Sequence, residues 1–137
     1  LNRLLVAEGA TGDAKLRSSI DWSVLDTTQG KLILNHWQRL GQFRARHVAV
    51  GAGQHIELSR TPYVFSRSYD HAGQSDHIVA AYSEHASFKE VPSGDVFAGV
   101  TPVHDAYNND TCLIRQSFIV CPTERNVALF ELAESDL

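Results

Sequence analysis

The sequence predicts a mainly β fold: an antiparallel β-sandwich preceded by an irregular loop and one long α-helix. In residues 30–47, apolar side chains recur at steps of three and four, which places them on one face of a helix. From residue 54 onward the apolar period changes to two, and Gly, Pro, Asn or Asp separates most of the short runs. The 137 residues, 43% of them apolar and 20% charged, suit a globular protein with one sizeable core.

Residues 1–29 are predicted to be irregular, with at most a short helical turn at residues 22–25. Gly9, Gly12 and Asp13 interrupt the segment, and no apolar period is sustained. Such a long irregular segment is unusual inside a compact domain, so we expect a loop that lies against another domain. The chain begins without Met and shows no signal peptide, a start that suits a segment of a longer protein.

The helix predicted over residues 30–47 has recognisable ends. Thr27 or Thr28 can cap its first turn by accepting a hydrogen bond from a free backbone N–H, and Gly51 and Gly53 end it. Its apolar face must be covered by the sheet or by a domain outside this chain. We interpret both histidines of this face as packing residues that also form hydrogen bonds. The face consists of Ile33, His36, Trp37, Leu40, Phe43 and His47.

The rest of the chain is predicted to hold roughly six to eight short strands. Short strands punctuated by turns are typical of an antiparallel sandwich or barrel. The candidate strands are residues 55–58, 63–69, 77–82, 87–91, 96–100, 112–121 and 126–132.

The composition argues against several classes of partner. A formal net charge of -4 provides no basic footprint for nucleic acid or for an anionic membrane. No apolar run approaches the roughly 18 residues that a membrane helix needs. We therefore expect no nucleic-acid partner and no membrane partner.

No metal site is expected from the spacing of the potential ligands. No two of the seven histidines are closer than six positions, whereas metal-binding histidines usually come in tight pairs. The oxygen-rich run at residues 105–110 lacks the Gly and Glu of an EF-hand loop and predicts a polar turn. Cys112 and Cys121 lie nine positions apart, which leaves two states open: a disulfide between neighbouring strands or two reduced core thiols.

Three stretches of the chain carry a resemblance to a known family. They are Arg17, Ile20 and Trp22 in the irregular loop, the helical run at residues 36–51, and the hairpin formed by residues 63–67 and 76–81. In order and spacing they resemble the end of the catalytic barrel and the C-terminal β-domain of the α-amylase family, glycoside hydrolase family thirteen. Ile20 stands where that family usually has Met. The resemblance covers about residues 7–82, and residues 83–125 match no part of the pattern and predict an insertion.

The resemblance implies two domains. Residues 1–53 would be the loop and last helix of a (β/α)8 barrel, and residues 54–137 a C-terminal β-sandwich. The chain would then be the non-catalytic portion of an enzyme that hydrolyses α-glucosidic bonds in starch-like glucans, with the β-domain stabilising the barrel. The family's catalytic carboxylates lie on barrel strands that this chain does not contain, so no catalytic residue is assigned. Retaining hydrolysis needs two carboxyl groups about 5 Å apart, so the chain alone is predicted to be inactive.

The resemblance also implies two substrate-binding residues. Arg17 and Trp22 would lie on a loop at the C-terminal face of the barrel, where active sites form. We favour the alternative for Trp22, in which it holds the loop against the barrel. The implied partners are the enzyme's own catalytic barrel and an α-glucan. No cofactor is assigned to this chain; calcium in the parent enzyme and the parent's location, exported or cytoplasmic, stay open.

Two other functions compete with this interpretation. One is an independent carbohydrate-binding β-sandwich, and the other is an interaction domain without affinity for sugars. A Trp37 exposed to solvent favours the missing barrel, whereas a Trp37 buried on the sheet favours an autonomous domain. A sugar platform needs at least two exposed rings. The candidate rings are Tyr63, Phe65, Tyr69, Tyr82 and Tyr107.

Overall fold

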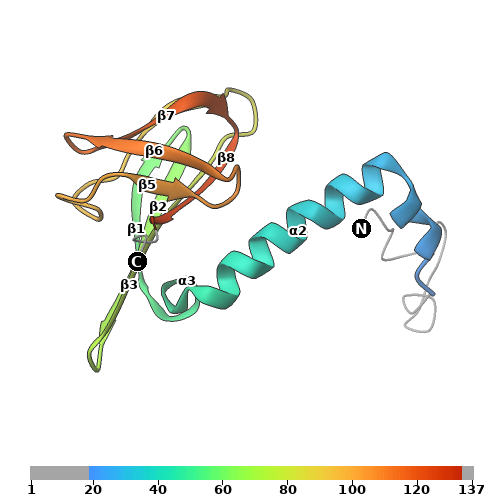
Figure 1. Ribbon diagram of the computed structural model, residues 1–137, viewed down its shortest axis with the longest axis horizontal. Coiled ribbons are helices and arrows are strands. Elements are labelled where there is room, and N and C mark those ends of the chain that lie inside the picture. The colour runs from blue at the N-terminus through green and yellow to red at the C-terminus, as the bar shows by residue number, and fades with distance from the viewer. Residues whose placement is uncertain (1–18, 134–137) are drawn as a thin grey trace. The chain divides into compact units, whose positions relative to one another are not determined.

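The computed structural model describes residues 19–133 and divides the chain into two compact units, Leu1–Leu40 and Gly41–Leu137. The described residues are mainly β, with an antiparallel sheet of eight strands and one long helix before it in the chain (Figure 1), which confirms the prediction at this level. The elements are η1 (Trp22–Asp26), α2 (Thr28–Arg46), α3 (Val48–Ala52), β1 (Gln54–Arg60), β2 (Tyr63–His71), β3 (Gln74–Tyr82), β4 (Phe88–Pro92), β5 (Val103–Asp105), β6 (Asp110–Arg115), β7 (Phe118–Arg125) and β8 (Val127–Leu132).

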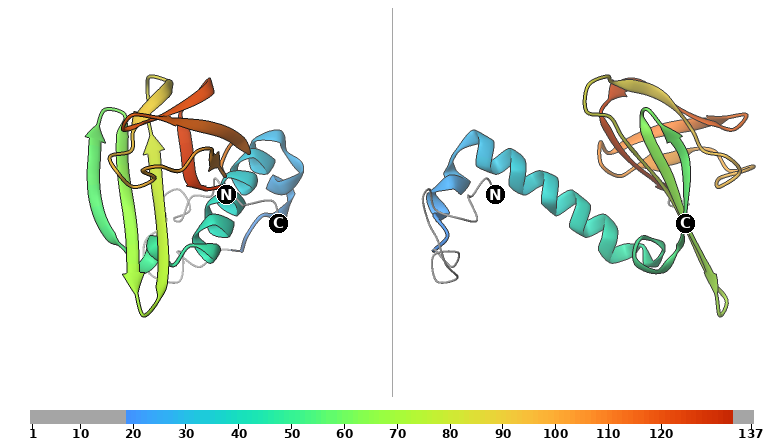
Figure 2. Two further views of the ribbon diagram at one scale, coloured as in Figure 1. Left: turned by 60° about the vertical axis from the view of Figure 1, so that its left-hand side comes forward. Right: turned by 180° about the vertical axis from the view of Figure 1, so that it is seen from behind.

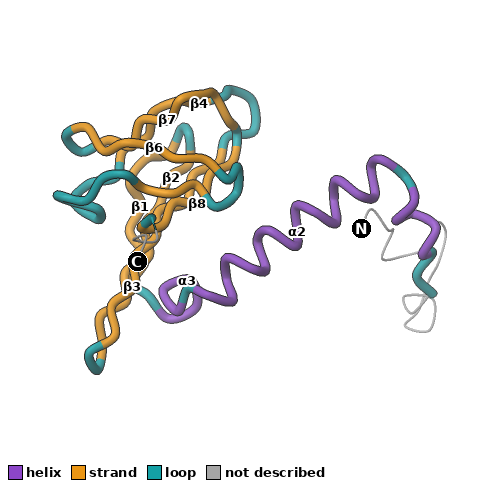
Figure 3. Tube along the Cα trace, viewed as in Figure 1, coloured by secondary structure: helices purple, strands orange, loops and turns teal. Residues whose placement is uncertain are grey.

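The first unit contains η1 and the beginning of α2, which Figure 3 colours as helix. Thr27 caps α2: its carbonyl accepts from the Lys31 N–H at 3.0 Å, and its hydroxyl oxygen accepts from the Gly30 N–H at 3.0 Å. Of the two predicted caps, Thr27 is therefore the one used. Gly30 is required here because a Cβ at this position would lie 1.9 Å from the carbonyl oxygen of Val24.

The predicted single helix is two helices in the structure. α2 ends at Arg46, His47 has extended backbone dihedrals (φ -117°, ψ 101°), and α3 begins at Val48. Residues 42–50 contain no Pro or Gly, so the sequence predicted no break before Gly51 and Gly53. Gly53 ends α3, where a Cβ would lie 2.6 Å from the carbonyl oxygen of Ala49.

The eight strands form one antiparallel sheet in the order β1-β2-β3-β8-β5-β6-β7-β4. The sheet curls into a nearly closed barrel (Figure 2). Residues 83–125, which match no part of the family pattern, contribute β4 to β7 to this sheet. This segment begins and ends at the same end of the β3–β8 pair, because the Ser83 N–H donates to the Asn126 carbonyl at 2.9 Å.

Two predicted strands differ from the observed ones. The run at residues 112–121 is a hairpin, because Gln116 takes a left-handed φ of 56° and turns the chain between β6 and β7. Residues 96–100 are turns, and the strand of that region is the three-residue β5.

The second unit buries apolar side chains on both faces of β3. Val79 and Ala81 lie in the barrel core, and Ile78 and Ala80, which alternate with them, face outward and are buried as well. α3 packs over β2 and β3, and its Ala49 is fully buried. The core cluster consists of Val64, Val79, Ala81, Phe88, Val91, Phe97, Val103, Cys112, Ile119, Cys121, Ala128 and Phe130.

Candidate functional site

A cluster of charged side chains fastens the end of α2 to the sheet in the second unit. We call it the Glu131 clamp, and it consists of Arg46, His47, Asp76, His104 and Glu131. Glu131, on β8, is only 8% exposed. Its carboxylate accepts hydrogen bonds from Arg46 Nε at 3.1 Å and Nη2 at 2.8 Å, a bidentate geometry that orients both groups.

Two histidines complete the shell around Glu131. The Nε2 of His47 hydrogen-bonds Oε2, and the Nδ1 of His104 lies 3.0 Å from Oε1. Burial alone would raise the pKa of the Glu131 carboxyl, but the hydrogen bonds from Arg46 and the two histidines outweigh burial and lower this pKa to about 2. Glu131 is therefore an anion over the physiological pH range.

His104 is held between two acceptors. Its Nδ1 faces Glu131, and its Nε2 lies 3.2 Å from Oδ1 of Asn109. Burial alone would lower the pKa of the His104 imidazole, but the hydrogen bonds to Glu131 and Asn109 outweigh burial and raise this pKa. The arrangement favours the imidazolium, in which both ring nitrogens donate.

His47 connects α3 to two strands. Its Nδ1 lies 2.8 Å from Oδ1 of Asp76, its Nε2 bonds Glu131, and its ring packs on Phe43 at a centroid distance of 4.4 Å. The interpretation of His47 as a packing residue that also forms hydrogen bonds is confirmed.

The short helix α3 is held at both ends by side chains of the sheet. Asp76 accepts from the Ala49 N–H at 2.9 Å. Arg67 donates to the carbonyl oxygens of Ala49 at 3.3 Å and Val50 at 3.0 Å. A carboxylate at the amino end and a guanidinium at the carboxyl end both suit the helix dipole.

Four members of these contacts were not predicted from the sequence: Arg67, Asp76, His104 and Glu131. The contacts join residues as far as 85 positions apart, and no local pattern announces them. The one available signal was a glutamate in the otherwise apolar run of the closing strand, because a buried carboxylate requires partners.

A hollow of about 400 Å³ opens beside the clamp. The only carboxylate among its described lining residues is that of Glu131, which is ionised and already bonded to three side chains. Such a group neither donates a proton at neutral pH nor stands free to attack a substrate. The clamp is therefore suited to holding α2 and α3 on the sheet. The lining residues are Arg46, His104, Thr111, Glu131, Leu132 and Ala133.

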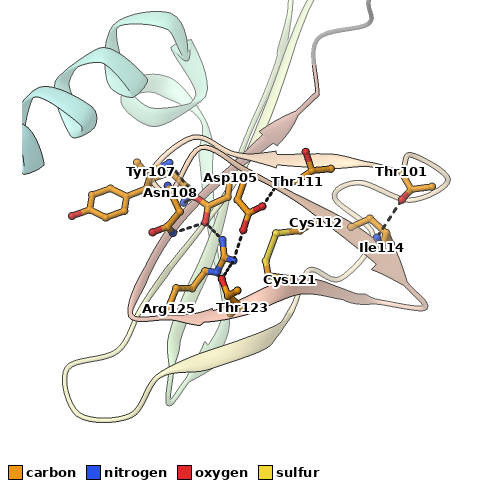
Figure 4. The surroundings of a disulfide bond; sticks show 12 residues. Thr101, Asp105, Tyr107, Asn108, Thr111, Cys112, Ile114, Cys121, Thr123 and Arg125 are labelled. Atoms are coloured by element: carbon orange, nitrogen blue, oxygen red, sulfur yellow. Dashed lines mark hydrogen bonds and ion pairs between the residues drawn. A yellow bond between two sulfur atoms is a disulfide. The ribbon is translucent and has the colours of Figure 1, made fainter.

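A second charged cluster lies next to the disulfide (Figure 4). Cys112 and Cys121 form a disulfide between β6 and β7, one of the two states that the sequence left open. Buried Arg125 donates to Asp105 at 2.6 Å and to Asp110 at 2.8 Å. Burial alone would lower the pKa of the Arg125 guanidinium, but these hydrogen bonds outweigh burial and raise it.

The predicted polar turn at residues 105–110 is an organised part of this cluster. Asp105 is fully buried and accepts from the backbone N–H groups of Tyr107 at 3.0 Å and Leu129 at 3.1 Å. The amide of Asn108 donates to Asp105 at 2.6 Å (Figure 4). Both carboxylate oxygens of Asp105 are thus hydrogen-bonded to groups of the protein itself. Across residues 19–133, no three His, Cys, Asp or Glu side chains are grouped to hold a metal ion.

The two substrate-binding residues implied by the resemblance stay predictions. Arg17 lies outside the described residues. Trp22 is the first residue of η1, and its exposed fraction is 66%. Further along the same unit, Leu32 and Trp37 of α2 are 60% and 61% exposed.

Two of the five candidate rings for a sugar platform are exposed. Tyr63 is 37% exposed and Tyr82 is 51% exposed, and the two are direct partners in the β2–β3 ladder. Phe65, Tyr69 and Tyr107 are half-buried.

Comparison with protein-family models, with curated proteins and with solved structures found no match to this chain. In the part of the chain that the structure describes, no helix is both long and apolar enough to cross a membrane.

Proposed function

We propose that this chain is the non-catalytic C-terminal portion of an α-amylase-type enzyme that hydrolyses α-glucosidic bonds in starch-like glucans. Residues 1–53 would end its (β/α)8 barrel, and residues 54–137 would be the counterpart of the family's C-terminal β-sandwich. The exposure of Trp37 carries this proposal. The sequence predicts that this tryptophan belongs to the covered face of a long helix, and in the structure it is exposed.

An exposed apolar face of this kind calls for a cover. Covering a side chain as large as Trp37 contributes on the order of 2 kcal/mol or more, and helices normally bury such faces against another element. The run at residues 36–51 resembles the last helix of an α-amylase barrel, so the barrel is the cover that we propose. An autonomous carbohydrate-binding module would have no use for this face.

The Glu131 clamp supports the role proposed for the β-unit. It joins Arg46 and His47, at the end of the helix, to Glu131 on β8 and Asp76 on β3, and His104 on β5 bonds to the same Glu131 carboxylate. In the proposed enzyme, these bonds would tie the last barrel helix to the β-domain. The β-unit would thereby oppose unfolding of the barrel at its last helix.

The first test reads the coding sequence of the parent protein upstream of Leu1. We expect a (β/α)8 barrel with an aspartate nucleophile, a glutamate acid/base and a third aspartate. The parent protein should release reducing sugar from soluble starch, and the 137-residue chain alone should release none. An upstream sequence without such a barrel, or hydrolysis by the chain alone, contradicts the proposal.

A second test probes the exposed face in the parent protein. Trp37→Ser should lower the unfolding temperature of the parent by several degrees, because the barrel loses a covered ring. Gln38→Ser is the matched control, since Gln38 is an exposed polar neighbour on the same helix. Equal effects of the two substitutions would show that Trp37 covers nothing in the parent.

A further inference from the structure

We propose that the outer face of β2 and β3, where Tyr63 and Tyr82 lie, is a binding site for a linear α-glucan. The choice of an α-glucan rests on the proposed function, whereas the site itself rests on the geometry of the second unit. Tyr63 and Tyr82 are register partners in neighbouring antiparallel strands, so their side chains leave the sheet on the same face and next to each other.

A hollow of about 310 Å³ lies beside the two rings. This volume is at the lower end of the range of roughly 300 to 1,000 Å³ that is typical of small-molecule sites, which suits one or two sugar units. A globular partner would need about 800 Å² of contact on each side. The lining residues are Arg60, Thr61, Pro62, Tyr63, Tyr82, Ser83, Glu84, His85 and Ala86.

The chemistry of the lining matches a sugar ring. A pyranose has C–H bonds on its faces and hydroxyl groups on its edge. The C–H faces stack on the electron-rich faces of aromatic rings. The hydroxyl edge needs donors and acceptors, which Arg60, Ser83 and Glu84 supply around the two tyrosines.

The ring of Tyr63 is already held in place. Its centroid lies 5.5 Å from that of Phe65, which in turn lies 4.8 Å from the ring of His55. The hydroxyl of Tyr63 lies 3.2 Å from Nε2 of His55. A ring fixed before binding loses little conformational entropy when a ligand stacks on it, which favours affinity.

The charges around the hollow favour a neutral ligand. Its lining contains one guanidinium, Arg60, and one carboxylate, Glu84, so their formal charges cancel. Arg60 is paired with Glu57 at 2.9 Å, and Glu84 lies 3.7 Å from His85. With no net formal charge in its lining, the hollow favours a neutral polyhydroxylated chain over a phosphate or a cation.

The test titrates the 137-residue chain with maltoheptaose and follows backbone amide shifts by NMR. We expect saturable shifts confined to residues 60–63 and 82–86. Tyr63→Ala and Tyr82→Ala should each weaken binding by about fivefold or more, as expected for an aromatic anchor. Tyr69→Ala is the matched control, since Tyr69 lies on the same face of β2 but opposite Asp76, and it should leave the affinity unchanged.

Separate controls distinguish a loss of folding from a loss of binding, and an α-linked from a β-linked glucan. If Tyr63→Ala lowers the unfolding midpoint, the test of the site rests on the more exposed Tyr82. Tyr82→Phe should then keep most of the affinity for maltoheptaose, and Tyr82→Ala should lose it. Absence of saturable shifts, or equal losses in Tyr69→Ala and Tyr82→Ala, overturns the site. Equal binding of cellohexaose, a β-linked glucan, overturns the α-glucan assignment. A missing barrel upstream of Leu1 would refute the proposed function alone, because it does not alter this titration.

Discussion

The two halves of α2 treat their apolar side chains differently. In the first unit, Trp37 is 61% exposed, whereas Phe43 in the second unit, from the same predicted face, is only 3% exposed. The sequence pattern is continuous through both halves. The difference shows that periodicity identifies a face that needs cover, while the nature of the cover depends on residues far away in the chain. The second half is anchored by the Glu131 clamp, and the first half leaves Trp37 at the surface.

Removing the anchor should have the largest effect. Glu131→Ala leaves Arg46, His47 and His104 without their shared carboxylate, so it should lower the free energy of unfolding of the second unit by about 3 to 5 kcal/mol. Urea unfolding followed by far-UV circular dichroism measures this loss. Glu57→Ala is the control, because its ion pair with Arg60 is exposed and should contribute less than about 1 kcal/mol. Similar losses in both variants would show that the clamp adds nothing to the anchor.

The pH dependence of stability should reveal the same carboxylate. The pKa of Glu131 is lowered from its ordinary value of 4.5 to about 2 in the folded protein, so its contribution to stability is present above pH 4.5 and is lost as pH falls toward 2. The pKa of His104 is raised above 6.5, so its contribution is present below pH 6.5 and is lost as pH rises through the folded-state pKa. Unfolding midpoints measured from pH 2 to pH 9 should fall at both ends. Glu131→Gln should flatten both limbs, and an unchanged profile would contradict the assignment.

Opening the disulfide should have an intermediate effect, confined to the second unit. Cys112 and Cys121 are nine positions apart, and the chain entropy of so short a loop corresponds to about 2 to 3 kcal/mol. A chain with both cysteines replaced by alanine should unfold at correspondingly lower urea concentration. A reductant should shift the native chain in the same direction and leave the double variant unchanged. A native chain insensitive to reductant would mean that the bond does not stabilise β6 and β7.

Gly30 and Gly41 of α2 differ in the space around them: Gly30 packs against the residues before the helix, and Gly41 has open space beside it. Gly30→Ala places a Cβ against the Val24 carbonyl, so it should disturb the start of α2 and cost about 1 to 3 kcal/mol. Gly41→Ala meets nothing within 4 Å and should stabilise the helix by about 1 kcal/mol. The helical signal in circular dichroism should therefore fall in the first variant and rise in the second. If the helical signal changed in the same direction in both variants, the two glycines would not differ in this way.

The smallest effect in the chain by itself is expected at Trp37. Because its ring is exposed, Trp37→Ser should change the unfolding free energy of the 137-residue chain by less than about 0.5 kcal/mol. Phe43→Ala, from the covered half of α2, should cost about 3 kcal/mol or more. Equal costs would mean that both halves of the helix are covered within the chain.

Local signals predicted a good part of the fold. The apolar steps of residues 30–47 indicated α2, Thr27 was one of the two expected caps, and period two indicated the β-unit. The break at His47 was missed because a histidine is not a helix breaker by itself. Here its side chain is bonded to Asp76 and Glu131, which lie 29 and 84 positions away.

The candidate sites were predicted less completely. The turn at Gln116 was missed because a left-handed φ is expected at Gly or Asn. The exposed tyrosines were among five candidate rings. Tyr63, Phe65 and Tyr69 share one face of β2, so the two-residue period does not tell which of these rings is covered by its neighbours. The Glu131 clamp follows from pairings between strands, and a single sequence does not state which strands are neighbours.

The meeting of Ser83 and Asn126 has a consequence for how the β-unit can change in size. β3 and β8 are adjacent strands, so everything between these two residues is a detour that starts and finishes at one place in the ladder. A detour of this kind can lengthen or shorten without altering the register of the strands on either side. The strands of this detour share one core cluster with Val64 and Val79 of β2 and β3, so a segment can be added at Ser83 and Asn126 more easily than the detour can be removed.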